Sequence, residues 1–242
     1  MKRIGLIGGL SPESTAHYYE MLCRGYNRRF GDLNFPEITI QSLNLQRLVS
    51  LFEKDDWDGV AAILLEALNR LKSAGAEFAA ILANTPHNAY EKIRDTSPLE
   101  ILTIMDAASA VLTRHSRRKV ALLGTRATME FGFFQNHFNS RGIETLVPAQ
   151  AQRLELDRII WKELSHGVIE PRSRAAAKEM IADLVKQDVE AVILGCTELC
   201  LLIKPEDSER PLYDTTRIHA DAILEYALEG APVSKSSEES KR

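Results

Sequence analysis

Short apolar runs alternate with longer amphipathic segments along most of the chain. An apolar run of this kind, bounded by glycine or polar residues, is typical of a strand buried on both faces. We expect strands at residues 2–7, 37–42, 77–82, 101–104, 119–123, 144–147, 191–194 and 211–214. Strands that alternate with helices predict an α/β fold, with parallel sheets and right-handed crossovers.

The segments between these strands have the spacing and the end signals of helices. Ser11, Pro12 and Glu13 open the first one, because serine caps a helix, proline suits its first turn and a carboxylate complements its dipole. We expect this helix to close at Gly31. Further helices are expected at residues 48–52, 57–73, in a stretch that ends at 93, and at 106–114, 128–139, 154–165, 172–187 and 216–228.

Two patterns occur twice in the chain. Residues 3–8 (Arg-Ile-Gly-Leu-Ile-Gly) are similar to residues 119–124 (Lys-Val-Ala-Leu-Leu-Gly), at an offset of 116. Residues 81–85 are similar to residues 193–197, at an offset of 112. Two matched pairs at nearly one offset indicate a duplicated α/β unit. We therefore expect two pseudo-symmetric parallel-sheet α/β domains, with the active site at their interface.

The expected domain limits follow from this duplication. The first α/β domain comprises residues 1–98 together with residues 212–230, because the final helix crosses back to it. The second α/β domain comprises residues 99–211. Residues 231–242 are rich in serine, lysine and glutamate and have no core residues, so we expect a disordered tail.

The composition is that of an ordinary globular protein, with 45% apolar and 26% charged residues. A net charge of −4 argues against a nucleic-acid partner, and no apolar run approaches the ~20 residues of a membrane span. Three cysteines are too few for a disulfide framework, and Cys196 and Cys200 have no nearby histidine pair to bind a metal. The chain enters a strand at once, leaving no room for a signal peptide, so we expect a cytoplasmic protein.

Chemically useful side chains follow the ends of the predicted strands. Cys196 is the first side chain beyond the strand that ends at Gly195. Open α/β sheets place their ligand crevice at this edge, where backbone amides can lower the pKa of a thiol. The alternative is a small buried apolar residue, as most unpaired cysteines are. The glycines at residues 8–9 lack a third glycine and a following lysine, which argues against a nucleotide-binding loop.

Three motifs together resemble the aspartate/glutamate racemase family, and the resemblance covers about residues 1–230. They are residues 8–15 (Gly-Gly-Leu-Ser-Pro-Glu-Ser-Thr) with Tyr18 and Tyr19, residues 84–87 (Asn-Thr-Pro-His) and residues 195–198 (Gly-Cys-Thr-Glu). The resemblance implies two α/β domains, no cofactor, a small amino-acid substrate and a homodimer. It also implies two opposed cysteines, of which one removes the α-proton and the other returns a proton to the opposite face.

Transferred to this sequence, the resemblance makes Cys196 the second of these two cysteines. Asn84, Thr85 and Thr197 match residues that hold the α-carboxylate of the substrate. Ala83 stands where the first cysteine is usual, and a methyl group offers no proton. We therefore expect a vacant first-base position at Ala83.

Other residues are candidates for contacts with the substrate. Ser11, Thr125 and Glu198 would border the cleft as helix caps or strand-end side chains. Arg47 lies near a position where relatives place a cation for the distal carboxylate. Ser165 stands where some relatives have a lysine for the same purpose.

We therefore expect a cofactor-independent racemase of a small amino acid, aspartate or glutamate, that works with one thiol. Two other functions stay open. One is a one-cysteine lyase similar to the related malonate decarboxylases, which need a single thiol to protonate an enolate. The other is a non-catalytic protein that binds an amino acid. We expect structural roles for His87, Cys23 and Cys200.

Overall fold

The computed structural model describes residues 1–229 and contains two parallel sheets of four strands each. The first sheet has the order β2-β1-β3-β4 and the second has the order β6-β5-β7-β8. The strands are β1 (Ile4–Gly8), β2 (Ile38–Ser42), β3 (Phe78–Ile81), β4 (Glu100–Ile101), β5 (Lys119–Gly124), β6 (Glu144–Leu146), β7 (Ala191–Gly195) and β8 (Leu212–Asp214). The predicted fold class is confirmed. The tail expected at residues 231–242 lies outside the described residues.

Helices connect these strands. They are α1 (Pro12–Phe30), α2 (Leu45–Phe52), α3 (Trp57–Ser73), α4 (Tyr90–Ile93), α5 (Ile104–Arg114), α6 (Arg126–Glu130), α7 (Phe133–Asn139), α8 (Gln150–Lys162), α9 (Pro171–Val185), α10 (Leu199–Leu202) and α11 (Thr215–Leu228), with short 3-10 turns η1 (Thr85–Ala89), η2 (Leu164–His166) and η3 (Pro205–Asp207). Helix α1 has the predicted ends, because the Ser11 side chain accepts a hydrogen bond from the Ser14 amide and Gly31 takes φ 67°.

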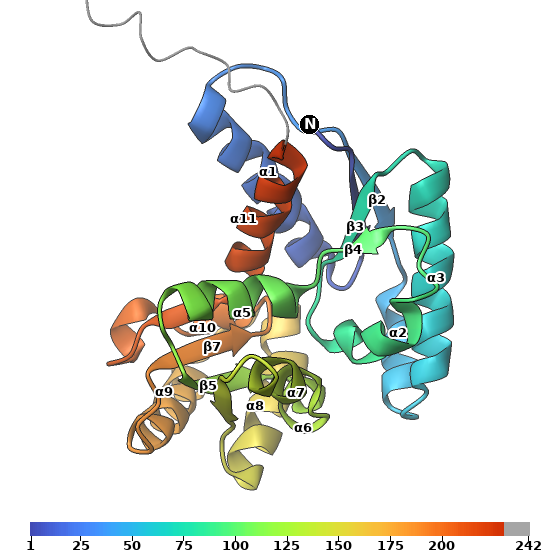
Figure 1. Ribbon diagram of the computed structural model, residues 1–242. Helices are drawn as coiled ribbons and strands as arrows, with labels where there is room; N and C mark the ends of the chain where they lie inside the picture. Colours follow the sequence, from blue (N-terminus) through green and yellow to red (C-terminus); the bar gives the residue numbers. More distant parts are fainter. Residues whose placement is uncertain (230–242) are drawn as a thin grey trace, which may run out of the picture.

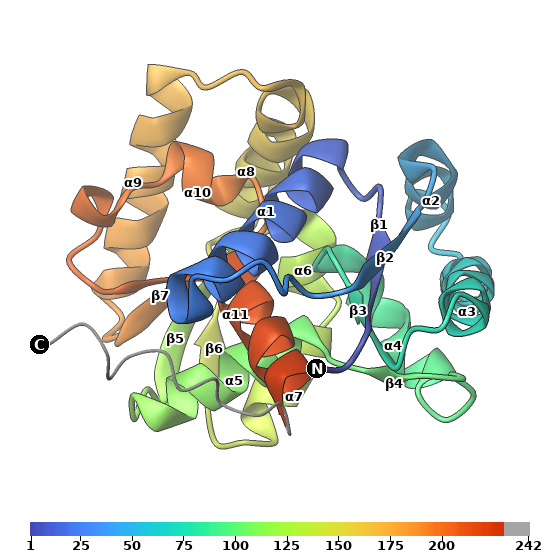
Figure 2. The same ribbon diagram turned by 90° about the horizontal axis from the view of Figure 1, so that it is seen from above.

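Each sheet is covered by helices on both faces (Figures 1 and 2). In the first sheet, Ile7 and Ile81 pack toward α3, whereas Leu6 and Phe78 pack toward α1 and α11. In the second sheet, one face packs against α8 and α9 and the other against α5 and α7. Side chains of successive strand residues point to opposite faces, so strands covered on both sides must be apolar throughout. This is why the apolar runs identified the strands.

The last helix returns to the first sheet. Helix α11 lies beside α1 in both views, and the Lys2 amide donates to the Ala227 carbonyl at 2.8 Å. Two strands lie on the other side of the expected domain limits. Strand β4 was expected in the second domain but pairs with β3 of the first sheet, and β8 was expected in the first domain but pairs with β7 of the second sheet. The residue limits of the two domains stay a prediction.

Strand pairing also defines the internal symmetry. Ile4 and Val120, which are offset by 116, pair with Phe78 and Ala191, which are offset by 113. The offset of the second matched pair is therefore 113 rather than the 112 derived from sequence similarity. With an offset of 113, Ala83 corresponds to Cys196. The vacant position and the thiol are thus equivalent places in the two halves.

Several helix limits differ from the predictions. The helix expected at residues 128–139 is two helices, α6 and α7, because Gly132 takes the left-handed φ of 78° between them. Helix α2 starts earlier than expected, since the Asn44 side chain caps it. Ile104 begins α5 rather than ending a strand, because Thr103 caps that helix. Helix α8 begins before Leu154 and its last predicted residues form η2.

Candidate active site

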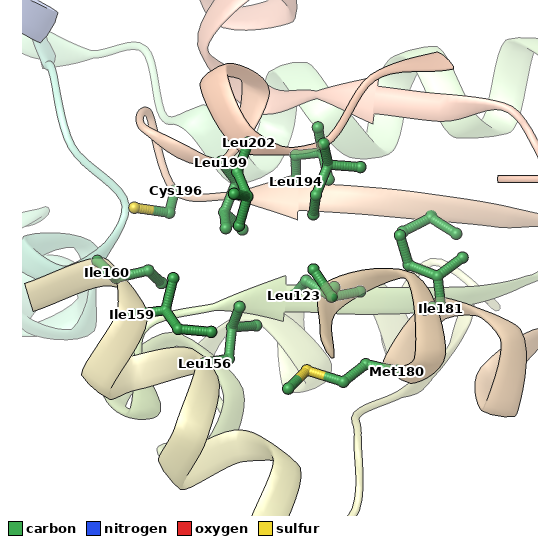
Figure 3. Packing of buried hydrophobic residues seen from close by; sticks show 14 of the residues in the cluster. Leu123, Leu156, Ile159, Ile160, Met180, Ile181, Leu194, Cys196, Leu199 and Leu202 are labelled. Atoms are coloured by element: carbon green, nitrogen blue, oxygen red, sulfur yellow. The ribbon is translucent and has the colours of Figure 1, made fainter. Parts of the chain in front are cut away.

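The thiol lies at the carboxyl end of β7. Cys196 follows this strand directly and is 7% exposed, at the end of the apolar cluster that joins β5 and β7 to α8, α9 and α10. Figure 3 shows its sulfur pointing away from Leu194, Leu199 and Leu202, which fill the interior of this cluster. Cys196 is thus a member of this buried cluster that lies at its edge. Its burial also fits the alternative of a small buried apolar residue, so the acid/base role of Cys196 stays a prediction.

Two adjoining cavities lie where the strand ends of the two sheets meet. The inner cavity has a volume of about 200 Å³ and the outer cavity about 480 Å³. Four residues line both cavities, namely Phe52, Thr85, Thr125 and Trp161, and we call them the shared wall. The inner cavity is lined by these predicted site residues: Ser11, Ala83, Asn84, Thr85, Thr125, Cys196, Thr197 and Glu198. The sequence therefore identified side chains that come together in space.

Glu198 is the centre of a hydrogen-bond cluster in the inner cavity. Its Oε2 atom accepts from the Cys196 thiol at 3.0 Å and from the Thr197 hydroxyl at 2.6 Å. Its Oε1 atom accepts from the Ser11 hydroxyl at 3.0 Å. Ser11 belongs to the start of α1, so this last bond joins the two halves of the molecule across the cleft.

The environment of Cys196 favours the neutral thiol. Burial raises its pKa well above the ordinary value, and the negative charge of Glu198 raises it further. The sequence led us to expect that helix amides would lower this pKa. A backbone hydrogen bond at Glu198 does lower the pKa, but burial and the charge of the Glu198 carboxylate outweigh it. A thiolate here requires that the proton leaves along the bond to Glu198, or that a cation enters the cavity.

Asn84 presents an unusual buried amide. The residue is 4% exposed, and neither its Oδ1 nor its Nδ2 atom has a hydrogen-bond partner among the described residues. Leaving a buried donor and acceptor unpaired costs free energy, so nearly all such groups in proteins are satisfied. Asn84 is one of the residues that line the inner cavity, so its unpaired amide is a candidate contact for a ligand that offers both an acceptor and a donor.

Hydroxyl groups from both halves meet beside Asn84. Thr85 and Thr125 lie 3.0 Å apart through their Oγ1 atoms, and Thr125 lies 3.1 Å from Thr128. Thr125 also caps α6, and Thr85 begins η1. Because Thr125 is 6% exposed and Thr85 is 8% exposed, this row of threonine hydroxyls is shielded from solvent. The row gives the cavity a polar surface to which both halves of the molecule contribute.

His87 supports the loop that carries Ala83. Its Nε2 atom accepts from the Ile104 amide at 3.3 Å, so its Nδ1 atom is the donor to the Ala83 carbonyl at 2.8 Å. Burial lowers the pKa of His87 to about 4, so the ring is neutral near pH 7. The ring does not line the inner cavity, which agrees with the predicted structural role.

One predicted contact is not in the cleft. Arg47 is exposed and lines neither cavity, and its backbone amide donates to the Asn44 side chain within the start of α2. Ser165 does line the inner cavity. Sequence reasoning missed Phe52 and Trp161, which come from α2 and α8. The sequence offered one signal for them: each is a large aromatic residue near the end of a helix, Phe52 on the short α2 and Trp161 on the more polar α8.

Neither a metal-binding cluster nor a membrane-spanning helix is found within residues 1–229. No group of three or more histidine, cysteine or acidic side chains within residues 1–229 is arranged to hold a metal ion. No helix in the same part of the chain is long and apolar enough to span a membrane. The other thiols, Cys23 and Cys200, are partly buried and lie outside both cavities.

Comparisons with known proteins agree with this geometry. Residues 7–223 match the family model described as Asp/Glu/hydantoin racemase. A crystal structure of a provisionally assigned Asp/Glu racemase from Yersinia pestis is 39% identical, with a TM-score of 0.89 over 94% of this chain and 100% of that one. An aspartate racemase homologue from Pyrococcus horikoshii is 34% identical, with a TM-score of 0.81 over 94% and 99% of the two chains. The broad specificity amino-acid racemase of Bacillus subtilis is 22% identical over 91% of this chain and 96% of that protein.

Proposed function

We propose that this chain, which belongs to the Asp/Glu/hydantoin racemase family, inverts the α-carbon of an amino acid with Cys196 as an acid/base. Membership of this family supports amino-acid racemase activity. The finer assignment rests on the inner cavity, where a single thiol lies beside an unpaired amide and a carboxylate. The homodimer stays a prediction.

The observation that carries the proposal is the unpaired amide of Asn84. A zwitterionic amino acid offers what this amide lacks, since its carboxylate accepts from Nδ2 and its ammonium donates to Oδ1. Thr85 and Thr197 also line the cavity. The Thr85 hydroxyl can donate to the same carboxylate while it accepts from Thr125, whereas the Thr197 hydroxyl donates to Glu198 and can bind the substrate only by giving up that bond. Glu198 contributes a negative charge that favours the ammonium group. The site therefore complements both ends of the amino-acid head group.

Cys196 and Glu198 carry out the proton transfers on one face of the α-carbon. In one direction the thiol proton moves along the 3.0 Å bond to the Glu198 carboxylate, and the thiolate then takes the α-proton. In the other direction the thiol donates its proton to the α-carbanion, and the thiolate is reprotonated through the same bond. Entry of a substrate ammonium offsets the charge of Glu198 and so makes the thiolate easier to form.

The opposite face of the α-carbon is toward Ala83, whose methyl group cannot act as an acid or a base. We propose that Thr85 or water serves that face, so that inversion is slow. A neutral hydroxyl is a far weaker base near pH 7 than a thiolate, because an ordinary thiol has a pKa of ~8.5. This leaves the equilibrium constant between the enantiomers unchanged and lowers only the rate.

A second candidate function is favoured by the single thiol. A lyase that releases CO₂ from a malonate needs one acid to protonate the enolate, and Cys196 is the one thiol among the residues that line the two cavities. A malonate has no ammonium group, however, so the acceptor of Asn84 would stay unpaired. This difference makes the amino acid the better ligand.

Incubating the purified protein with single enantiomers in deuterated water separates these functions. A racemase incorporates deuterium at the α-carbon and produces the other enantiomer, measured by proton NMR and chiral chromatography. A one-base enzyme gives exchange with retention, and a lyase releases CO₂ from a malonate. A protein that only binds amino acids gives a calorimetric signal with no exchange. Absence of exchange with every amino acid would refute the proposal.

A further inference from the structure

The charges around the inner cavity are all negative. Among its lining residues, which lie within the described part of the chain, the charged ones are Glu13 and Glu198, and none is lysine, arginine or histidine. Burying a second substrate carboxylate here would leave it without a cation and close to existing negative charge. Unpaired buried charges are strongly disfavoured.

The remaining wall is apolar. Leu10, Leu45 and Ile160 line the inner cavity, and the rings of Phe52 and Trp161 continue into the outer one. Phe52 stacks on Trp57 with ring centroids 5.4 Å apart. Trp57 in turn meets Phe131 edge-on at 5.6 Å, so aromatic rings from α2, α3 and the α6–α7 turn form a continuous band. Such a band offers a large apolar contact area to a side chain that leaves the inner cavity.

We propose that the cleft selects an amino acid with an uncharged, apolar side chain, such as leucine, methionine or phenylalanine, over aspartate and glutamate. This inference rests on the proposed function and concerns the same site. The head group occupies the inner cavity at Asn84 and Cys196. The side chain passes between Phe52 and Trp161 toward the outer cavity.

An acidic side chain would need a cation for its distal carboxylate, and the candidate cations line the outer cavity. Arg158 is engaged by Glu155 and by Glu163, at 2.7 and 2.9 Å. Arg126 lies 3.8 Å from Glu130. Lys162 is exposed and has no ion pair within residues 1–229, so it is the strongest candidate for holding a distal carboxylate. It lines only the outer cavity, so a distal carboxylate meets it only after passing the shared wall, where the rings of Phe52 and Trp161 favour an uncharged side chain.

The first test compares substrates on the unmodified protein. Deuterium exchange is measured with leucine, methionine, phenylalanine, alanine, aspartate, glutamate and lysine, and binding of each is measured by calorimetry. We expect kcat/KM and affinity for the three larger apolar amino acids to exceed those for aspartate and glutamate by about tenfold or more. A preference for acidic amino acids or for lysine would overturn the inference.

The second test uses variants of the wall. Trp161→Ala should lower kcat/KM for leucine and phenylalanine about tenfold more than for alanine, because the larger side chains extend along Trp161 toward the outer cavity. Equal losses for all three would overturn the inference. Ser165→Lys places a cation in the inner cavity and should raise kcat/KM for aspartate relative to leucine, whereas the neutral Ser165→Met should not. Lys162→Met should leave the substrate preference unchanged, and a selective loss of acidic substrates would contradict us.

These measurements also separate the inference from the proposed function. Exchange with acidic amino acids alone would refute the side-chain assignment and leave the racemase assignment intact. Absence of exchange with every amino acid would refute the racemase assignment. In that case calorimetry still decides the side-chain class, because tighter binding of leucine than of aspartate supports it and the reverse order overturns it.

Discussion

The ends of strands β3 and β7 occupy equivalent places in two sheets of the same strand order, yet they carry different chemistry. After β3 come Ala83 and Asn84, a methyl group and a neutral amide. After β7 come Cys196 and Glu198, a thiol and a carboxylate joined by a hydrogen bond of 3.0 Å. The duplicated fold thus determines where the two ends face the cleft, and the residue types determine which end can move a proton.

The two ends are also held in different ways. The β3 end is held by the buried neutral ring of His87, which donates to the Ala83 carbonyl, and by the Thr85 hydroxyl, which is hydrogen-bonded to Thr125 of the other half. The β7 end is held from the opposite half, by the Ser11 hydroxyl on Glu198. Both ends therefore have a hydrogen bond to the other half, and they differ in the groups that make it. In the proposed function, the β3 end serves mainly for binding and the β7 end for proton transfer.

The largest effect is expected at the reactive end. Cys196→Ser should lower α-proton exchange by on the order of 10²–10⁴ or more, because a hydroxyl replaces the positioned thiol. Exchange is measured by proton NMR in deuterated water. Cys23→Ser is the matched control, since that thiol lies on α1 outside both cavities, and it should leave exchange unchanged. Full exchange in the Cys196→Ser protein would remove Cys196 from the mechanism.

A thiol at the β3 end should remove the difference between the two faces of the α-carbon. Ala83→Cys should raise the rate of inversion on the order of 10² in both directions, because the second face then has an acid/base of its own. Initial rates are measured from each pure enantiomer. Ala83→Ser, which adds a hydroxyl of similar size, should give little gain. If Ala83→Cys binds substrate and folds but gains nothing, then position 83 is not the vacant base.

The features of the two strand ends that could be predicted are those encoded by residues that are neighbours in the sequence. Cys196 was found because a strand, a glycine and a thiol follow one another in the chain. The equivalence of Ala83 and Cys196 was missed by one residue, since similarity aligns the Asn-Thr and Cys-Thr pairs whereas strand pairing aligns backbone positions. Register is set by hydrogen bonds between strands far apart in sequence, and no local pattern reports it.

The cleft walls were less predictable for the same reason. Arg47 was proposed because relatives place a cation near this position, but here the residue lies in the first turn of α2, which Asn44 caps, and it is exposed. Phe52 and Trp161 line the same two cavities although they lie far apart in the sequence, on α2 and α8. The raised pKa of Cys196 likewise depends on the position that the Glu198 carboxylate takes beside the sulfur.

A smaller effect is expected at the binding end. Asn84→Leu should raise KM by about 10–100-fold, since hydrogen bonds to charged groups contribute about 1.5–3 kcal/mol each. It should not lower the free energy of unfolding, because the amide has no partner among the described residues and leucine has a similar volume. Substrate kinetics and urea denaturation are measured on the same protein. A destabilised variant with unchanged KM would mean that Asn84 is structural.

The smallest effect is a shift in pH dependence at the reactive end. The pKa of Cys196 is raised by burial and by Glu198, so exchange that needs the thiolate should increase as the pH rises. Glu198→Gln keeps the shape of the side chain and removes its charge, which lowers the pKa of the thiol. The rise in rate should then occur at lower pH, while the maximal rate falls because the amide cannot take the thiol proton. The profile of exchange rate against pH is measured for both proteins. A shift toward higher pH would show that Glu198 does not act on Cys196 through its charge.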